Sequence, residues 1–510
     1  MDRSIFDKYE PVIGLEVHAQ MKTKTKAFCR CSTDFHSSPN SNVCPVCLGY
    51  PGTLPVLNEE LVDYSIRMGL AVNCSIRENS IFARKNYFYP DLTKGYQITQ
   101  FETPLCYNGF LIIDMTKYNV KIAKDSKVDI VPTSELRLKR IGITRIHLEE
   151  DAGKSIHDFH DDDTLIDFNR CGVPLIEIVS EPDINSTEEA YQYLSKIRQT
   201  LVYLEINDGN LEEGSMRCDA NVSVRLKGTK ELGTRTEIKN LNSFKNVVDA
   251  IESEIKRQTE LIESGEKVYY QTMTYNAKER KTTATRSKEE AHDYRYFPEP
   301  DLVKLKVDRE WINKVEKELP EFPDAKKERF LKKYSISESD AEELTQDKKF
   351  AEYFEKISGY LINKNEKTYR SVANILRVDV KRILNDKKIE LNEFPLSERM
   401  IAMLADSVSA GNISVTASKE IFSQLLEGKT EEDQEKIFRK AEESLSQVSD
   451  NTEIELIVKK IIEENPKETE RYRIGEKKLA GFFVGKIMQE SKGKANPKVV
   501  NELLIKNLEA

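Results

Sequence analysis

The chain has 510 residues and a mass of 58.7 kDa. It is too long to fold around a single hydrophobic core of ordinary size, so we expect two to four domains. Its 78 Lys and Arg residues against 87 Asp and Glu residues give a net charge of -9, which argues against a protein that coats nucleic acid through bulk charge. No apolar run approaches the roughly 18 residues of a membrane helix, and the first ten residues lack the apolar core of a signal peptide, so we expect a cytoplasmic protein with no membrane partner.

The first 300 residues predict an α+β domain with a mainly antiparallel sheet. Short alternating segments, punctuated by Gly, Pro and Asn, are typical of strands. They cover residues 12–21, 142–153, 174–182 and 216–226. Two helices are predicted among them, at 57–71 and at 243–263. The second is capped by Asn242 or Ser243 and stops at Gly265.

The composition changes after residue 300. Charged helical segments follow, of which 371–384 and 397–408 are the clearest. Acidic and Ser-rich sequence at 428–450 predicts a break, and the last 70 residues have amphipathic helices of their own. We therefore predict three domains, with boundaries at 1–300, 301–440 and 441–510.

Polar side chains that could act in catalysis or bind a metal lie on one face of each predicted strand. This follows because residues two apart point to the same side of a sheet. Glu16 and His18 share one face of the first strand. His147 and Glu149 share a face of the second, and Asp219 alternates with apolar residues in the fourth.

Glu177 lies between Leu175 and Val179 on an otherwise apolar face, where a charge is costly unless a cation meets it. One interpretation is that these polar faces are the solvated side of a sheet. The other is a concave surface that holds a hard divalent cation, since Mg²⁺ takes carboxylates and waters and bridges to phosphates.

Four of the eight cysteines fall within 19 positions, in the pattern C-x-C, twelve residues, C-x-x-C. Thiolates at these spacings are typical of a closed tetrahedral zinc site, which is structural; the alternative is four unrelated buried cysteines. The predicted ligands are Cys29, Cys31, Cys44 and Cys47.

The common nucleotide-binding motifs are absent from the sequence: it contains neither G-x-x-x-x-G-K-[ST] nor a G-x-G-x-x-G after a predicted strand. Two dense loops, 84–100 and 293–301, combine Lys and Arg with Tyr and Phe. They either clamp phosphates and stack on bases, or form ordinary turns at the edge of a core. The residues alone thus indicate a metal-dependent cleft that handles phosphate.

The same segments carry a specific resemblance that extends over essentially the whole chain. In order, they are IGLEVHAQ, RKNYFYPDLTKGYQI, IHLEEDAGKS, GVPLIEIVSEPD, EEGSMRCDANVSVR, EIKNLNSF and DYRYFPEPD. The chain resembles the B subunits of the aspartyl/glutamyl-tRNA amidotransferases (GatCAB complexes), and its last residues, 477–504, are similar to the YqeY-like tail of that family. The archaeal E subunits share the first portion but are longer, with an inserted domain for which this chain has no room.

The resemblance implies that residues 1–300 form a catalytic cradle domain of a glutamine-hydrolysing ligase. ATP phosphorylates the side-chain carboxylate of Glu on misacylated tRNA(Gln), or of Asp on misacylated tRNA(Asn). Ammonia from the glutaminase A subunit then displaces the phosphate, within a heterotrimer of A, B and C subunits. The sequence does not distinguish between the two tRNA substrates.

Carried onto this sequence, the resemblance implies a magnesium cluster of His18, Glu149 and Glu177, with Glu16 and Asp219 close by. Lys85 would contact phosphate, and with Glu16 would bind the nucleotide. Glu150 competes with Glu149 for the metal, and strand alternation favours Glu149 because it shares a face with His147. The family varies at the cysteine positions and some members lack the cysteines entirely, which agrees with a structural zinc.

The tail is locally basic in a chain that is acidic overall: residues 471–498 contain eight Lys or Arg and two Glu. We expect it to grip the tRNA body, although a solvated basic surface is the plainer interpretation. Two rival functions also remain: a passive tRNA-binding scaffold, and a metal-dependent phosphohydrolase that acts without partner subunits.

Overall fold

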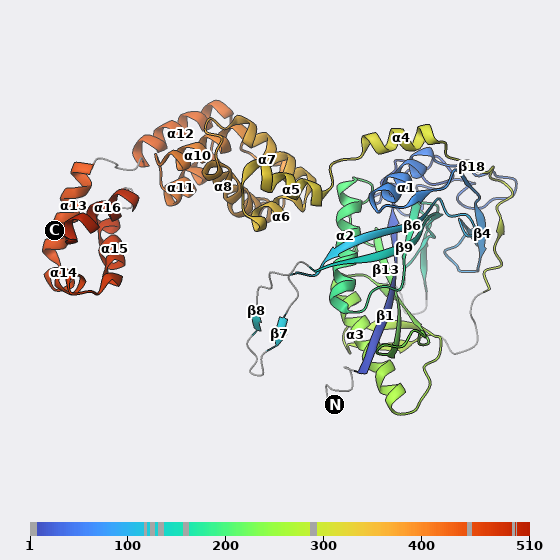
Figure 1. The fold of residues 1–510 in the computed structure, drawn as a ribbon. Helices are drawn as coiled ribbons and strands as arrows, with labels where there is room; N and C mark the ends of the chain where they lie inside the picture. Colours follow the sequence, from blue (N-terminus) through green and yellow to red (C-terminus); the bar gives the residue numbers. More distant parts are fainter. Residues whose placement is uncertain are drawn as a thin grey trace. The chain divides into compact units, whose positions relative to one another are not determined.

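The computed structural model describes residues 8–116, 120–122, 128–130, 137–156, 163–285, 293–445, 451–491, 495 and 497–509. They belong to two compact units, Met1–Pro320 and Glu321–Ala510, which are drawn in Figure 1. The first unit contains the sheet and the second is helical, so the chain is an α+β protein as predicted.

A nine-stranded sheet dominates the described part of the first unit. In spatial order its strands are β16 (Lys281–Ala284), β15 (Thr272–Asn276), β14 (Thr236–Leu241), β13 (Met216–Leu226), β1 (Tyr9–Gln20), β12 (Pro174–Ser180), β9 (Leu138–Glu150), β6 (Cys106–Asp114) and β2 (Ser75–Ile76). All neighbours are antiparallel except β14 and β15. The four strands predicted from the sequence, β1, β9, β12 and β13, are adjacent at its centre.

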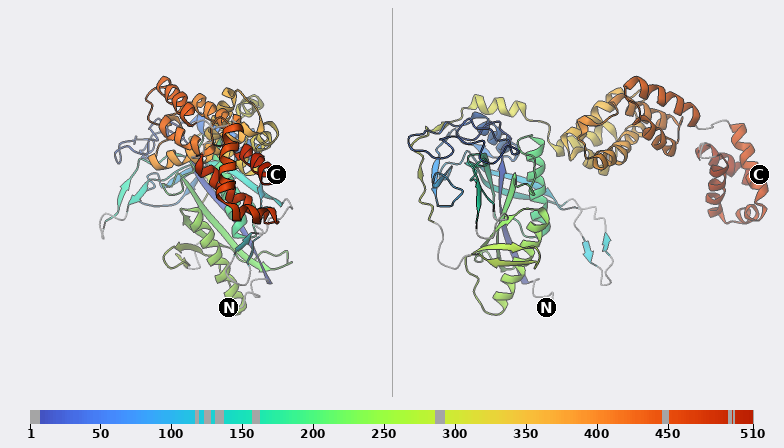
Figure 2. Two further views of the ribbon diagram at one scale, coloured as in Figure 1. Left: turned by 90° about the vertical axis from the view of Figure 1, so that its left-hand side faces the viewer. Right: turned by 180° about the vertical axis from the view of Figure 1, so that it is seen from behind.

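Three helices cover one face of this sheet, as Figures 1 and 2 show for α2 (Thr187–Tyr203) and α3 (Phe244–Glu263). The third is α1 (Glu59–Ala71). The central strands present side chains such as Ile13 and Leu15 to the helices, and both are fully buried. Since alternate residues point the other way, the polar residues lie on the face that the helices leave uncovered.

The predictions for α1 and α3 are confirmed, and Ser243 is the cap of α3. Helix α2 was missed by the sequence analysis. Its signal was present: the Ser186 hydroxyl accepts a hydrogen bond from the backbone N–H of Glu189, and a Ser-x-x-Glu pattern precedes apolar residues at helical spacing.

A smaller sheet brings together the two dense loops singled out in the sequence. Its strands are β17 (Phe297–Pro298), β4 (Ala83–Asn86) and β5 (Tyr96–Thr99), in that order. The remaining short strands of this unit are β3 (Asn79–Ser80), β7 (Val120–Ile122), β8 (Val128–Ile130), β10 (Lys154–Ile156), β11 (Leu165–Asp167) and β18 (Leu305–Lys306).

The first unit ends after α4 (Arg309–Glu318), and helices make up the second. These are α5 (Pro323–Tyr334), α6 (Glu338–Thr345), α7 (Lys348–Tyr360), α8 (Glu366–Asn374), α9 (Lys381–Lys387), α10 (Glu398–Ala410), α11 (Val415–Leu425), α12 (Glu431–Leu445), α13 (Asn451–Glu464), α14 (Pro466–Arg473), α15 (Ala480–Glu490) and α16 (Pro497–Glu509). The predicted helix at 371–384 is interrupted by a π-helical stretch, Ile375–Val380, and the one at 397–408 corresponds to α10.

Among the described residues of the helical unit, buried side chains form two separate clusters, one between Phe330 and Ala441 and one between Ile454 and Leu508. The break predicted at 428–450 is wrong for residues 431–445, because they form α12. Its acidic residues are helix formers, and Phe438 and Ala441 pack into the first cluster.

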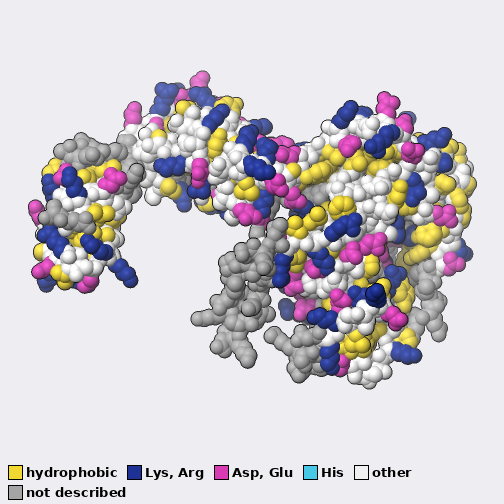
Figure 3. Space-filling view, in the orientation of Figure 1, with side chains coloured by type: hydrophobic (Ala, Val, Ile, Leu, Met, Phe, Trp, Pro, Cys, Tyr) yellow, Lys and Arg dark blue, Asp and Glu magenta, His cyan; other side chains and the backbone are white. Residues whose placement is uncertain are grey.

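In the space-filling view, Lys and Arg side chains are interspersed with Asp and Glu over the helical unit (Figure 3). Among the described residues, no helix is both long enough and apolar enough to cross a membrane.

A buried carboxylate fastens α3 to the sheet. Glu254 has no exposed surface and accepts hydrogen bonds from Thr236 of β14 at 2.8 Å and from Thr282 of β16 at 2.9 Å. Gln258 and Arg257 donate to it as well. Burial by itself raises the pKa of this carboxyl, but the hydrogen bonds and charge of Arg257 hold the pKa below its usual range.

We therefore expect Glu254→Gln to lower the unfolding free energy of the sheet unit by about 2 kcal/mol at pH 7, as for hydrogen bonds to a charged group. A carboxyl with a lowered folded-state pKa stabilises above its unfolded-state pKa, and this stabilisation is lost as the pH falls through the folded-state value. Urea unfolding should thus show a smaller difference from wild type in acid than at pH 7. Glu252→Gln, on the exposed side of the same helix, should leave the unfolding free energy unchanged both at pH 7 and in acid.

Candidate functional site

Strand register aligns three ionisable side chains across the uncovered face of the sheet. His18 of β1 is paired with Glu177 of β12, which is paired in turn with His147 of β9. The Nε2 atoms of the two imidazoles lie 3.2 Å and 3.4 Å from Oε2 of Glu177. One carboxylate therefore sits between two histidines.

Glu149 completes this group from two residues further along β9, with Oε2 at 3.3 Å from His147 Nε2. The side chains of His147, Glu149 and Glu177 are buried, and each offers a ligand atom within 4.8 Å of the others. We call these three residues the carboxylate cluster. Two carboxylates and one imidazole suit a divalent cation that keeps waters or phosphate oxygens as its further ligands.

Mutual charge decides the protonation of the cluster. Burial lowers the pKa of His147, but Glu177 and Glu149 outweigh it and raise the pKa to about 9. Burial raises the pKa of Glu177, but His147 and His18 hold it well below its usual range. The raised pKa of His147 favours its imidazolium form, which is a counter-ion to the two carboxylates.

Lys85 reaches the cluster from β4 of the smaller sheet. Its Nζ atom is 3.6 Å from Oε1 of Glu149, whose Oε2 accepts a hydrogen bond from Thr99 of β5 at 3.0 Å. Burial lowers the pKa of Lys85, but Glu149 and then Glu177 raise it above its ordinary value, so the ammonium stays charged.

Glu150, the alternative to Glu149, points away from the cluster. Its Oε1 contacts Nζ of Lys94 and accepts a hydrogen bond from the backbone N–H of Ile98 at 2.9 Å. It lines a cavity of about 200 Å³ beside Cys47. Its neighbours thus differ from those of Glu149, as strand alternation requires.

Glu16 and Asp219 face each other across β1 and β13, two residues along β1 from His18. Glu16 accepts a hydrogen bond from Asn221 at 2.8 Å, and burial together with the charge of Glu177 raises its pKa. Asp219 pairs with Lys239 at 3.2 Å. Both carboxylates therefore border the carboxylate cluster on the same face.

His147, rather than His18, belongs to the group with mutually close ligand atoms, and the resemblance did not single it out. The signal was available, because His147 alternates with Glu149 on one strand face. The sequence analysis also gave no role to Arg217, which is paired with His18 and donates to Asp151 at 2.9 Å.

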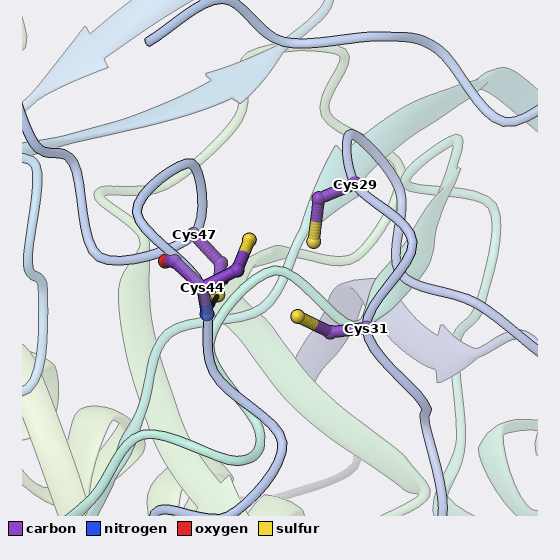
Figure 4. A group of neighbouring side chains, drawn as sticks. All are labelled: Cys29, Cys31, Cys44 and Cys47. Carbon is purple, nitrogen blue, oxygen red and sulfur yellow. Dashed lines mark hydrogen bonds between the residues drawn. The ribbon is translucent and has the colours of Figure 1, made fainter.

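The four cysteines predicted as a metal site come together from two turns (Figure 4). Their sulfur atoms all lie within 4.8 Å of one another. A hydrogen bond from Cys29 lowers the pKa of Cys47 to about 4, despite burial, and Nζ of Lys26 lies 3.7 Å from its sulfur. Four converging thiols, one of them with a lowered pKa, fit a tetrahedral metal ion.

Comparison with known proteins identifies the family of this chain. Residues 11–313 match the model of the GatB/GatE catalytic domain, and residues 352–508 match the model of the GatB domain that is associated with YqeY.

Curated relatives named as the B subunits of aspartyl/glutamyl-tRNA(Asn/Gln) amidotransferases are similar over nearly their whole length. Those of Thermodesulfovibrio yellowstonii and Chlorobium phaeobacteroides are each 50% identical, over 504 and 501 residues, and that of Caldanaerobacter subterraneus is 49% identical over 502. Each match covers 98% of this chain and 99% of the relative. The resemblance found in the sequence is therefore confirmed, and the chain belongs to the family of the aspartyl/glutamyl-tRNA amidotransferase B subunits.

Proposed function

We propose that this chain activates the side-chain carboxylate of Glu carried by tRNA(Gln), or of Asp carried by tRNA(Asn), by phosphorylation with ATP. Ammonia then attacks the acyl phosphate, so that the carbon–nitrogen bond forms as the carbon–oxygen bond to phosphate breaks. The observation that supports this most strongly is the carboxylate cluster with Lys85 at its edge.

The chemistry explains why such a cluster suits the reaction. A carboxylate is inert to ammonia near neutral pH because oxide is a poor leaving group, whereas phosphate is a good one. Phosphoryl transfer requires chiefly alignment and neutralisation of charge, and no protein nucleophile. His147, Glu149 and Glu177 would hold Mg²⁺, with His18 orienting Glu177 from β1. When bound, the ion neutralises charge on phosphate oxygens.

Lys85 and Glu16 are proposed to contact the nucleotide. The ion pair with Glu149 fixes the position of the Lys85 ammonium, which can there attract a phosphate group. Glu16 and Asp219 lie next along the same open face.

We assign zinc to Cys29, Cys31, Cys44 and Cys47, in a structural role. Four protein ligands leave no open position for a substrate, so this metal contributes folding energy and no chemistry.

The glutaminase A subunit and a C subunit are the proposed partners in a cytoplasmic heterotrimer, and the basic tail is proposed to bind the tRNA body. Of its basic residues, Lys486 donates to Asn465 at 2.8 Å, and Arg471 pairs with Glu476 at 2.7 Å. Lys492 and Lys494 lie outside the described residues.

Substituting the carboxylates tests the proposed chemistry. Glu149→Gln or Glu177→Gln keeps the side-chain size but removes a charge, so acyl-phosphate formation should fall about 100-fold or more, the effect of losing one electrostatic stabiliser. Single-turnover transfer of labelled phosphate from ATP measures this, while tRNA binding should persist. Glu231→Gln, at an exposed position, serves as the control.

Glu150→Gln in the same assay distinguishes between the two adjacent carboxylates. A larger loss of acyl-phosphate formation than for Glu149→Gln would indicate that Glu150, and not Glu149, is the metal ligand. Full amidation by Glu149→Gln would favour the scaffold function. Turnover of ATP by the isolated chain, without A and C subunits, would favour the phosphohydrolase.

Metal analysis tests the cysteine site. The purified chain should contain about one zinc, and Cys31→Ser should lose it, since a structural zinc contributes on the order of 10 kcal/mol. The 25–55 segment should then become susceptible to proteolysis, and acyl-phosphate formation should be impaired only indirectly. Cys171→Ser is the matched control, because this buried thiol lies next to Cys47 outside the group of four. A metal-free chain with a protease-resistant 25–55 segment would contradict the assignment.

Truncation tests the tail. A cut after residue 440 would remove part of α12, including Ala441 from the first helical core, so we place the cut after residue 450. The truncated complex should show a raised KM for misacylated tRNA and a shallower salt dependence, by nearly one unit of slope for each phosphate group that the tail no longer binds. Zinc content and tRNA-independent glutaminase activity should not change. An unchanged KM for misacylated tRNA would indicate that the basic tail has another role.

A further inference from the structure

A row of aromatic rings starts beside the carboxylate cluster and ends at the surface. Tyr87 and Tyr294 lie at its inner end, with ring centroids 6.0 Å apart, and Tyr294 is followed by Tyr296 at 5.9 Å. Tyr296 is stacked on Phe101, with a centroid distance of 4.1 Å and an interplanar angle of 3°. We call Tyr87, Tyr294, Tyr296 and Phe101 the aromatic row.

The row is continuous with the proposed reaction site. Nζ of Lys85 lies 5.3 Å from the ring centroid of Tyr294 and 3.6 Å from Oε1 of Glu149, so one ammonium contacts both. The smaller sheet fixes this arrangement, because β4 carries Lys85 and pairs with β17, which directly follows Tyr296.

The outer end of the row is exposed. Phe101 is 52% accessible although Tyr296 covers one face of its ring, and Phe88, in the neighbouring loop, is 81% accessible. The parallel stacking on Tyr296 holds the Phe101 ring in one orientation. A rigid aromatic face that is open to solvent is the usual platform for an unpaired nucleobase.

Cations accompany the row. Arg295 lies between Tyr294 and Tyr296 in the sequence and is exposed. Its backbone adopts a φ of 43°, in the left-handed region, and its carbonyl accepts a hydrogen bond from Asn86 at 2.9 Å. This strained backbone is held by the β4 strand that also carries Lys85, so the aromatic and basic groups are positioned together.

We propose that Phe101, backed by Tyr296, is the stacking platform for a base of the unpaired 3′ end of the aminoacylated RNA, with Arg295 beside the sugar-phosphate backbone. This inference rests on the proposed function. The carboxylate that reacts is separated from the terminal ribose by a single amino-acid residue. The unpaired end must therefore lie next to the carboxylate cluster, where the aromatic row begins.

The test uses the full chain assembled with its A and C subunits. Phe101→Leu removes the π face but stays apolar, whereas Phe101→Trp keeps the face. The leucine variant should raise the KM for misacylated tRNA about 5- to 150-fold, which corresponds to the 1–3 kcal/mol of one stacked base. The tryptophan variant should stay near wild type. Phe35→Leu, at an exposed phenylalanine in the cysteine loop, should have no effect.

A second readout reports stacking without requiring catalysis. RNA with 2-aminopurine in its unpaired 3′ end, tested at each position in turn, should lose fluorescence on binding to the wild-type and Phe101→Trp complexes at the position that stacks, and should keep more of it with Phe101→Leu.

The outcomes separate the two proposals. A wild-type complex that forms no amide refutes the proposed function, whereas the fluorescence measurement still reports on stacking. Unchanged KM and unchanged quenching in Phe101→Leu would overturn the platform. Dissociation of the Phe101→Leu complex into its separate chains during gel filtration would also overturn it, because the exposed ring would then be a protein interface.

Discussion

The site depends on the balance of charge around Glu177. A carboxylate this deeply buried is strongly destabilised unless cations meet it. Here two imidazoles meet it from the strands on either side, His18 from β1 and His147 from β9, and the Lys85 ammonium lies beside the neighbouring Glu149. The same arrangement keeps two acidic ligands ionised and close together, which is the condition for attracting a divalent cation.

The sheet makes this balance possible by dividing its two faces. Helices α1, α2 and α3 bury the apolar face, which supplies the stability of the unit, so the other face is free to carry charge. Antiparallel register then places His18, Glu177 and His147 side by side, although His18 is separated from the other two by more than a hundred residues of sequence.

Much of this could be predicted from the sequence. Period-two alternation correctly put Glu16 with His18 and Glu149 with His147, and cysteine spacing found the four thiols. Alternation could not show which strands are neighbours, because register depends on long-range pairing. For this reason the approach of His147 to Glu177, across β9 and β12, could not be predicted. The acidic stretch at 431–445 was misread because composition does not distinguish a solvated linker from a helix with one buried face.

The group of four cysteines and the carboxylate cluster are mechanically connected. Thr93 donates a hydrogen bond to the carbonyl of Cys47 at 2.8 Å, which anchors the start of the 93–99 segment on the cysteine turn. Lys94 then contacts Glu150, and Thr99 at the other end holds Glu149. Because Glu149 and Glu150 are adjacent in β9, this short segment ties both carboxylates to the position of the cysteine turn. A change in the position of the cysteine turn would therefore be transmitted through residues 93–99 to Glu149.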